Sequence, residues 1–221
     1  MTSACRLCSS LKSHPFKEAW DIPLFESPNF VAVPSLGALV EGWLLLIPKC
    51  HVLSLGSLPD STHEELNEFK EFLYAALIQC YGSASAFEHG PIIEKSAVGC
   101  GVDHAHLHIV PMALDLTIEV TPHLPKGANW TPAGLSECQD AHRSGLDYLY
   151  FEQSNGRGRI TTGRALGSQL FRRAIAARLG IPQQYNWREN AQLSNILQTI
   201  SVIRGWQEHS HLTRQSCLAI A

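Results

Sequence analysis

Apolar positions in the first half of the chain alternate between strand-like runs and one helical pattern. The runs at 30–33 and 42–47 are typical of strands, and a turn region with Pro34-Ser35-Leu36-Gly37 separates them. From 61 to 80 apolar residues recur with helical spacing, and Ser61 and Glu64 have the spacing of a capping box. Two later apolar runs complete the pattern and predict strands at 84–88 and 104–110. This half of the chain therefore predicts an α+β fold.

The second half begins with a linker-like passage rich in proline and glycine. The elements predicted after it are a strand at 147–152, a hairpin turn at Asn155-Gly156, a returning strand at 157–160, and helices at 168–179 and 193–203. We accordingly expect a domain over residues 1–125 and a basic C-terminal extension over residues 126–221.

Composition narrows the class of protein. A chain of 221 residues with 45% hydrophobic content suits a folded domain, and no apolar run approaches the ~18 residues of a membrane span. Residues 1–10 lack the apolar centre of a signal peptide. The seven cysteines, an odd number, therefore favour a reducing, cytoplasmic compartment and metal-bound or free thiols rather than disulfides.

Charge is divided unevenly along the chain. Residues 1–125 carry six Lys/Arg and 14 Asp/Glu, a net charge of −8, whereas residues 126–221 carry eleven and six, a net charge of +5. Ten of the eleven C-terminal cations are arginines, whose guanidinium group binds phosphate or carboxylate at two points. As a set they favour an anionic ligand, while the overall charge of −3 argues against binding of bulk nucleic acid.

Three histidines alternate with small or apolar residues in the run from Asp103 to Pro111. In a strand, His104, His106 and His108 would share one face at intervals of about 7 Å. A row of imidazoles does not stabilise a hydrophobic core, because each buried ring nitrogen needs a hydrogen-bond partner. The face therefore predicts an active site or a metal site.

Three chemistries would use such a face: a chelated catalytic metal such as the iron of an oxygenase, a zinc-stiffened binding module, or a histidine that attacks phosphorus. The first needs a carboxylate soon after the His-x-His pair, but the next acidic residue is Asp115.

The third chemistry is favoured by a resemblance. The run from His104 to Val110 fits the pattern His-φ-His-φ-His-φ-φ, and it resembles the histidine triad (HIT) superfamily of nucleotide hydrolases and transferases. Three companion motifs stand in the expected order, namely Cys5-x-x-Cys8, Pro48-Lys49-Cys50-His51 and Glu88-His89-Gly90. The resemblance covers about residues 1–115 and implies a HIT-like fold with an antiparallel sheet and packed helices, to which the C-terminal hairpin and helix are added.

The resemblance also implies catalytic roles for the triad. His106 would attack the α-phosphorus of a nucleotide or dinucleotide and form a covalent nucleotidyl-histidine, with His108 contacting the phosphate and His104 completing the triad. Backbone N–H groups around Gly99, Cys100 and Gly101 would add fixed donors, because glycine lets the backbone approach a phosphate closely.

A structural zinc ion is the implied cofactor. Cys5 and Cys8 have zinc-knuckle spacing, and a closed site needs four ligands. In zinc-containing members of the superfamily the other two ligands are the histidine after the second strand and the first histidine of the triad, which correspond here to His51 and His104.

The chain departs from the superfamily at two places. Many members have glutamine and then serine or threonine before the triad, where this chain has Gly99-Cys100-Gly101, so Ser96 is a candidate substitute donor. Where members place an Asn or Asp for the ribose hydroxyls, this chain has Pro34-Ser35, so Asn29 and Ser35 are candidates for that contact.

The extension is expected to fold over the triad, with Arg157 and Arg159 holding the leaving phosphate. The predicted function is that of a nucleotide hydrolase or nucleotidyltransferase, and whether water, phosphate or another acceptor attacks the intermediate stays open. The alternative is a nucleotide-binding regulatory module of the same fold, although the intact His106 argues against it. No membrane partner is expected, and a homodimer stays open.

Overall fold

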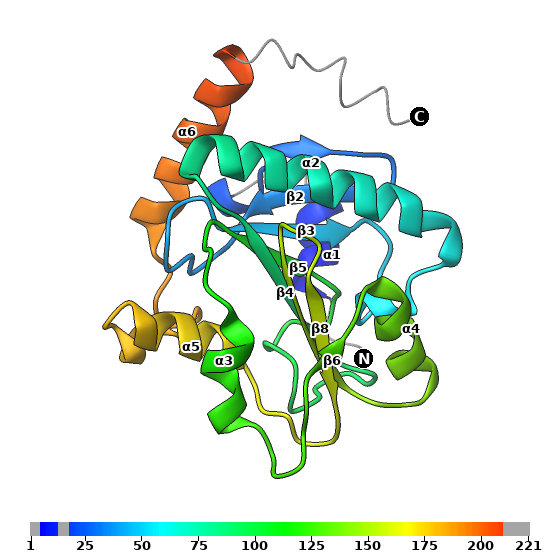
Figure 1. Cartoon of the computed structure of the whole chain (residues 1–221). Helices are drawn as coiled ribbons and strands as arrows, with labels where there is room; N and C mark the ends of the chain where they lie inside the picture. Colours follow the sequence, from blue (N-terminus) through cyan, green and yellow to red (C-terminus); the bar gives the residue numbers. More distant parts are fainter. Residues whose placement is uncertain (1–4, 13–17, 210–221) are drawn as a thin grey trace.

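One eight-stranded sheet forms the centre of the computed structural model, which describes residues 5–12 and 18–209 (Figure 1). The strand order is β1-β2-β3-β5-β4-β7-β8-β6, and every neighbouring pair is antiparallel. The strands are β1 (Phe25–Glu26), β2 (Phe30–Pro34), β3 (Leu44–Pro48), β4 (Ser85–Gly90), β5 (Leu107–Val110), β6 (Thr131–Pro132), β7 (Tyr148–Gln153) and β8 (Gly158–Thr162). The predicted α+β class with an antiparallel sheet is confirmed.

Helices cover both faces of this sheet. The α-helices are α1 (Arg6–Lys12), α2 (His63–Tyr81), α3 (Leu116–Val120), α4 (Leu135–Arg143), α5 (Leu170–Arg178) and α6 (Leu193–His209). Short 3-10 helices are η1 (Ala19–Asp21), η2 (Leu55–Ser57), η3 (Asp60–Thr62), η4 (Thr121–His123) and η5 (Pro182–Gln184). No helix in these described residues has the length and apolar character needed to cross a membrane. In Figure 1, α2 lies across one side of the sheet with α6 beside it, and α3 and α5 lie together at the other side.

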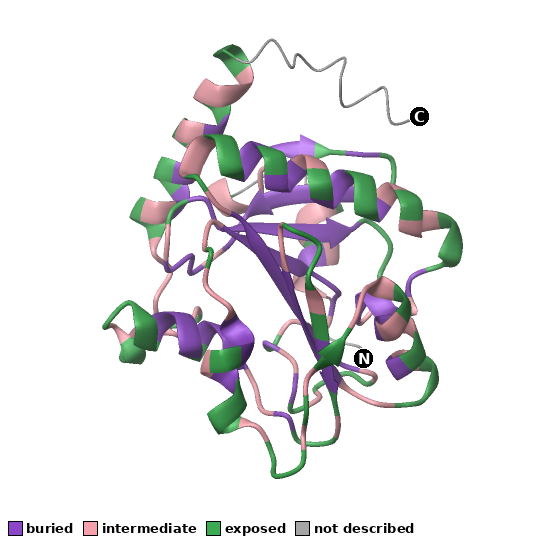
Figure 2. Ribbon diagram, viewed as in Figure 1, coloured by how far each residue is buried: buried purple, intermediate pink, exposed green. Residues whose placement is uncertain are grey.

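Alternation along the strands sends neighbouring residues to different parts of the core. In β2, Phe30 and Ala32 pack in the cluster that includes α2, whereas Val31 and Val33 pack in the cluster that includes Leu7 of α1. These two clusters lie on opposite faces of the sheet. A third cluster lies on the same face as Leu7, where the sheet packs against α3 and α5. Because both faces are covered, strands β2, β3, β4 and β5 are buried throughout, as Figure 2 shows, and β2 and β3 are continuous apolar runs.

The long helix begins differently from the prediction. Asp60–Thr62 forms a 3-10 turn, and α2 begins at His63 without a side-chain cap, so the predicted capping box at Ser61 and Glu64 is wrong. Glu64 and Glu65 still lie in the first turn, where a carboxylate interacts favourably with the helix dipole. The helix ends at Gly82, whose φ of 85° is the left-handed conformation that glycine adopts without strain.

The strand that carries the triad is shorter than predicted. It begins at Leu107, because the backbone before it makes other contacts: the N–H of Ala105 donates to the carbonyl of Val52, and the carbonyl of His104 accepts from the ring of His106. The passage at 111–134 also contains α3, η4 and β6, so it is not a simple linker. Finally, β7 pairs with β4 over its whole length, so the residues after 125 continue the same sheet.

Candidate functional site

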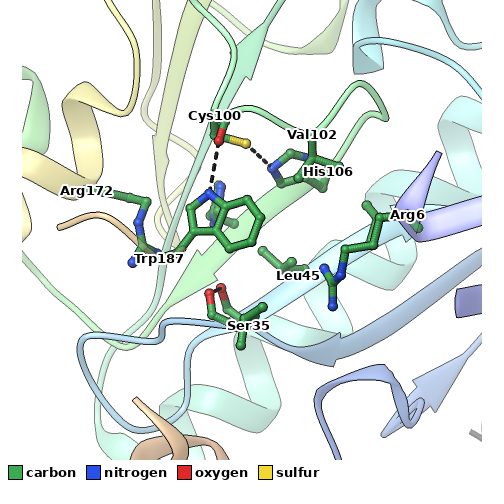
Figure 3. A pocket seen from close by; sticks show the side chains of 11 residues that line it. Arg6, Ser35, Leu45, Cys100, Val102, His106, Arg172 and Trp187 are labelled. Carbon is green, nitrogen blue, oxygen red and sulfur yellow. Dashed lines mark hydrogen bonds between the residues drawn. The ribbon is translucent and has the colours of Figure 1, made fainter. Parts of the chain in front are cut away.

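A cavity opens between α1 and α5, on the face of the sheet opposite to α2 (Figure 3). Three groups of residues line it. The triad contributes His106 and His108, and the loop before the triad contributes Cys100 and Val102. The other lining residues come from α1, from β3 and the segment after β2, and from the C-terminal part, and they are Arg6, Leu7, Ser35, Leu36, Leu45, Arg172 and Trp187.

The ring of His106 presents a lone pair to this cavity. Its Nδ1 lies 2.7 Å from the carbonyl oxygen of His104, which can only accept, so Nδ1 carries the proton and donates. In the neutral ring Nε2 is therefore unprotonated. The thiol of Cys100 lies 2.8 Å from Nε2 and donates to it. The geometry thus fixes the tautomer that a nucleophilic imidazole needs.

The Cys100–His106 contact couples the protonation of the two groups. Burial alone would lower the pKa of His106, but the charge and hydrogen bond of Cys100 and the hydrogen bond to the His104 carbonyl outweigh it and raise this pKa to about 9. Burial would raise the pKa of Cys100, but the charge and hydrogen bond of His106 lower it. Both shifts favour the proton on Nε2, so the contact favours an imidazolium–thiolate pair, and His106 becomes a nucleophile only when that proton leaves Nε2.

His108 has the opposite tautomer. Trp43 Nε1 donates to His108 Nδ1 at 3.0 Å, and because an indole nitrogen can only donate, the proton of the neutral imidazole lies on Nε2. Burial lowers the pKa of His108 well below its usual value, and the charges of His106, His89 and Arg172 lower it further, so the ring is neutral at pH 7. Within the described residues its buried Nε2 has no hydrogen-bond partner. His108 therefore lines the cavity with an unused N–H donor.

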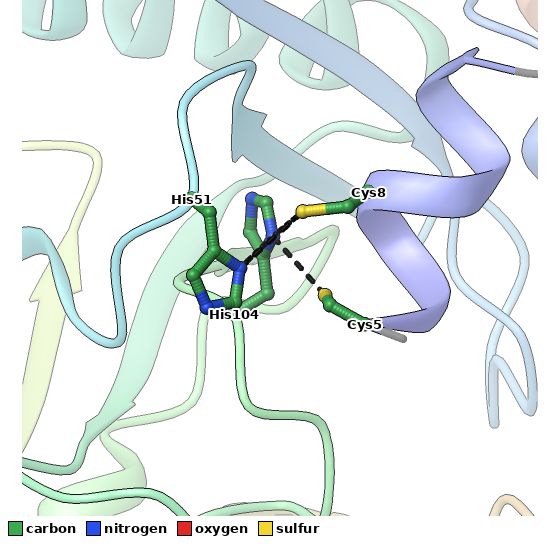
Figure 4. Close-up of side chains that lie close together, drawn as sticks. All are labelled: Cys5, Cys8, His51 and His104. Carbon is green, nitrogen blue, oxygen red and sulfur yellow. Dashed lines mark hydrogen bonds between the residues drawn. The ribbon is translucent and has the colours of Figure 1, made fainter. Parts of the chain in front are cut away.

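The first histidine of the triad belongs to a second cluster. One donor atom from each of Cys5, Cys8, His51 and His104 lies within 4.8 Å of the others, and Cys8 on α1 and Cys5 just before it point toward the two rings (Figure 4). His104 Nδ1 lies 3.4 Å from each sulfur and 3.3 Å from His51 Nδ1, and His51 Nδ1 lies 3.3 Å from Cys8 Sγ.

These distances fit a tetrahedral metal ion. Zinc bonds of about 2.3 Å to sulfur and 2.0 Å to nitrogen place ligand atoms about 3.3–3.8 Å apart. The donor set fits as well, because His104 Nε2 donates to the carbonyl of Pro48 at 2.8 Å and leaves Nδ1 free to bind a metal. The four residues named from the sequence can therefore hold one metal ion.

Several solved structures share this fold in part. A hypothetical histidine triad nucleotide-binding protein from Sulfolobus tokodaii strain 7 is 21% identical, with a TM-score of 0.41 over 49% of this chain and 68% of its own. A HIT-like protein involved in cell-cycle regulation from Bartonella henselae, with an unknown ligand, is 17% identical, with a TM-score of 0.36 over 57% and 86%. A zinc-bound histidine triad family protein from Mycobacterium smegmatis is 18% identical, with a TM-score of 0.41 over 64% and 92%. No protein-family model matches the chain, and no curated protein matches its sequence.

All three structures are named as histidine triad or HIT-like proteins. At these TM-scores the likeness does not assign an activity, so the chemistry is inferred below from the side chains of this chain.

The loop before the triad is held by the C-terminal extension. Its three carbonyls, of Gly99, Cys100 and Gly101, accept hydrogen bonds from Ser168 (2.6 Å), Trp187 (3.0 Å) and Arg188 (2.8 Å), respectively. Gly101 has a φ of 86°, and a Cβ atom there would collide with the Arg188 guanidinium. The extension therefore sets the shape of the loop expected to bind phosphate, which supports the expectation that it acts at the triad.

Other predicted substrate contacts lie elsewhere. The Ser96 hydroxyl donates to Asp147 at 2.8 Å, and the Asn29 side-chain amide donates to Glu65 at 2.6 Å. Arg157 and Arg159 are exposed on the β7–β8 hairpin. None of these four lines the cavity, whereas Ser35, the other ribose candidate, does.

The structure adds three residues that sequence reasoning missed: Trp43, Arg172 and Trp187. Trp43 sets the tautomer of His108, and Arg172 and Trp187 bring a cation and an aromatic ring from the extension to the cavity. The excess of arginine in the extension pointed to an anionic ligand, but no local pattern distinguishes Arg172 from the exposed Arg173 beside it.

Proposed function

We propose that this protein is a nucleotide hydrolase or nucleotidyltransferase that acts through a covalent bond between His106 and the α-phosphorus of its substrate. One observation carries the proposal: His106, whose Nδ1 proton is held by the carbonyl of His104, lines a cavity together with the unused N–H of His108 and the guanidinium of Arg172. A nucleophile surrounded by donors suits attack on an anionic, electrophilic phosphorus.

The reaction has two displacement steps. In the first, a bond forms between Nε2 and the α-phosphorus while the bond from phosphorus to the leaving oxygen breaks, and the leaving group departs with that electron pair. In the second, water or a phosphate acceptor attacks the same phosphorus and the electron pair returns to Nε2. Throughout, the Nδ1 proton remains hydrogen-bonded to the carbonyl of His104, which stabilises the positive charge that develops on the ring.

Cys100 has to leave Nε2 before the first step. At 2.8 Å its thiol occupies the position that a phosphorus atom needs for attack. When substrate displaces the side chain, the proton moves from Nε2 to sulfur, because separation removes the mutual charge interaction that raises the pKa of His106 and lowers that of Cys100, and His106 is left neutral. This contact also favours the alternative function, because a protein that kept the thiol on Nε2 would bind nucleotides without turning them over.

Cys5, Cys8, His51 and His104 would hold a structural zinc ion, as proposed from the sequence. Bound zinc supplies a rigid closed anchor rather than a reactive centre. Because His104 also provides the carbonyl that orients His106, the same residue connects the anchor to the nucleophile. The cytoplasmic, reducing compartment expected from the cysteine content of the sequence remains part of this proposal.

A panel of nucleotides and dinucleoside polyphosphates tests the proposed function. Protein is mixed with each compound, quenched under conditions that preserve phosphoramidates, and analysed by mass spectrometry after digestion. We expect a nucleotidyl group on the peptide that contains His106, and its decay should match product release. Tight nucleotide binding without adduct or product would instead establish the regulatory module.

Alkylation of Cys100 provides a further prediction. Iodoacetamide should modify this low-pKa thiol and abolish adduct formation, because the added group lies beside His106 Nε2. The Cys100→Ser variant should resist inactivation, whereas Cys50→Ser, which changes an exposed thiol, should remain sensitive. The measurement compares residual turnover with the modified fraction of each cysteine. Full turnover by protein modified at Cys100 would show that the thiol does not control access to the nucleophile.

A further inference from the structure

Arg172 is a buried cation that no carboxylate of the described residues pairs with. Its side chain on α5 is 1% exposed, and its partners are neutral: Nε donates to the carbonyl of Tyr185 at 2.8 Å, and Nη2 donates to the carbonyl of Gly37 at 2.5 Å. The guanidinium also lies 4.9 Å from the ring centre of Trp43. Among the residues that the structure describes, no carboxylate forms an ion pair with it.

Burial of the Arg172 guanidinium raises the free energy of the folded protein unless an anion binds to it. Taking a charge out of water is unfavourable, and carbonyl and ring contacts compensate only in part. Burial lowers the pKa of Arg172 to about 10, partly offset by the charge of Cys100, so the group stays protonated at neutral pH. Arg172 lines the cavity beside His106 and His108. The cavity therefore offers a place where an anion can bind to the Arg172 guanidinium.

Trp43 holds two donors of this cavity in fixed positions. The face of its indole ring supports Arg172, and its N–H directs the His108 proton to Nε2. That Nε2 is buried and has no partner within the described residues, so it is a second donor that lacks an acceptor. One aromatic side chain thus prepares a charged and a neutral donor for the same anion.

We propose that Arg172 is a catalytic residue, which binds the phosphate that His106 attacks and stabilises the charge that develops on its oxygens. Arg172 would replace the glutamine that many superfamily members have before the triad. This chain lacks that glutamine. Since Arg172 lies in the C-terminal extension, the catalytic site is incomplete without that part of the chain. This inference rests on the proposed function of His106.

The test compares Arg172→Gln and Arg172→Lys with Arg173→Gln, which removes the exposed neighbouring arginine that stacks on Tyr185. Single-turnover formation of nucleotidyl-His106 should be about 100-fold or more slower in Arg172→Gln, with a smaller change in KM. Arg172→Lys should recover part of the rate, because it restores the charge without the two-point geometry. Arg173→Gln should stay within about twofold of the wild type, as expected for a surface substitution.

Inorganic phosphate provides a second readout that needs no turnover. It should raise the melting temperature of the wild type, Arg173→Gln and Arg172→Lys, but not that of Arg172→Gln. Adduct formation at the wild-type rate by Arg172→Gln, or equal stabilisation of it by phosphate, would overturn the proposal. If Arg172→Gln does not fold, wild-type rates in Arg172→Lys would overturn it as well. A third outcome separates the two proposals. If the wild type forms no adduct but phosphate still stabilises it in a way that depends on Arg172, the nucleophilic role of His106 is refuted and the anion site at Arg172 is retained.

Discussion

Turnover should fall by about four to six orders of magnitude when His106 is replaced by alanine, because the variant lacks the atom that forms the bond to phosphorus. The fold should persist, since the ring lines the cavity and hydrogen-bonds only to Cys100 and to the carbonyl of His104. The measurements are the rate of product formation, the yield of adduct and the melting temperature. Near-normal turnover in this variant would exclude the covalent mechanism.

Two controls separate loss of the nucleophile from loss of structure. His123→Ala removes an exposed histidine outside the cavity and should leave turnover unchanged. His106→Gly creates space for free imidazole, which should restore release of the leaving group and yield nucleotidyl-imidazole in solution. A variant that folds but is not rescued, together with unchanged binding of nucleotide, would favour the regulatory module.

Loss of the metal site should have the largest effect on stability. The double variant Cys5→Ser, Cys8→Ser should lose one zinc ion per chain and several kcal/mol of unfolding free energy, or about 10–20 °C in melting temperature. Cys8 lies on α1 and Cys5 directly precedes it, and Leu7 of this helix packs against β2 and β3, so release of the metal would also loosen one wall of the cavity.

Metal analysis and thermal denaturation check this expectation. Cys80→Ser, which changes a half-buried cysteine outside the cluster, is the matched control and should retain the zinc. Any turnover that remains in the folded double variant should fall much less than in His106→Ala, because the cluster does not contact substrate. Protein purified without chelators that contains no zinc, or a double variant as stable as the wild type, would contradict the structural role.

Local patterns in the sequence were sufficient to predict most of the strands and helices of the fold. Strands β2, β3 and β4, the β7–β8 hairpin and helices α2, α5 and α6 all lie close to their predicted positions, because apolar periodicity reports which face of an element is buried. The short helices α1 and α4 were not predicted, since the seven residues of α1 carry too few repeats to show a period and the nine residues of α4 are mostly polar. The triad was identified from its alternating spacing and Cys5 and Cys8 from zinc-knuckle spacing, whereas His51 and His104 were assigned as their partners by the resemblance to the histidine triad superfamily.

The tertiary structure decided which charged and polar residues surround the nucleophile. Asn29 and Ser96 were candidates from their position in the sequence, but each binds a nearby carboxylate instead. Arg157 and Arg159 follow a hairpin turn and remain in solvent. Of the two arginines that line the cavity, Arg6 is paired with Asp21, and the other is Arg172, 129 positions after the tryptophan that supports it. Periodicity records whether a residue is buried, whereas its partners depend on how α5 packs against the sheet, and that packing follows from many distant contacts at once.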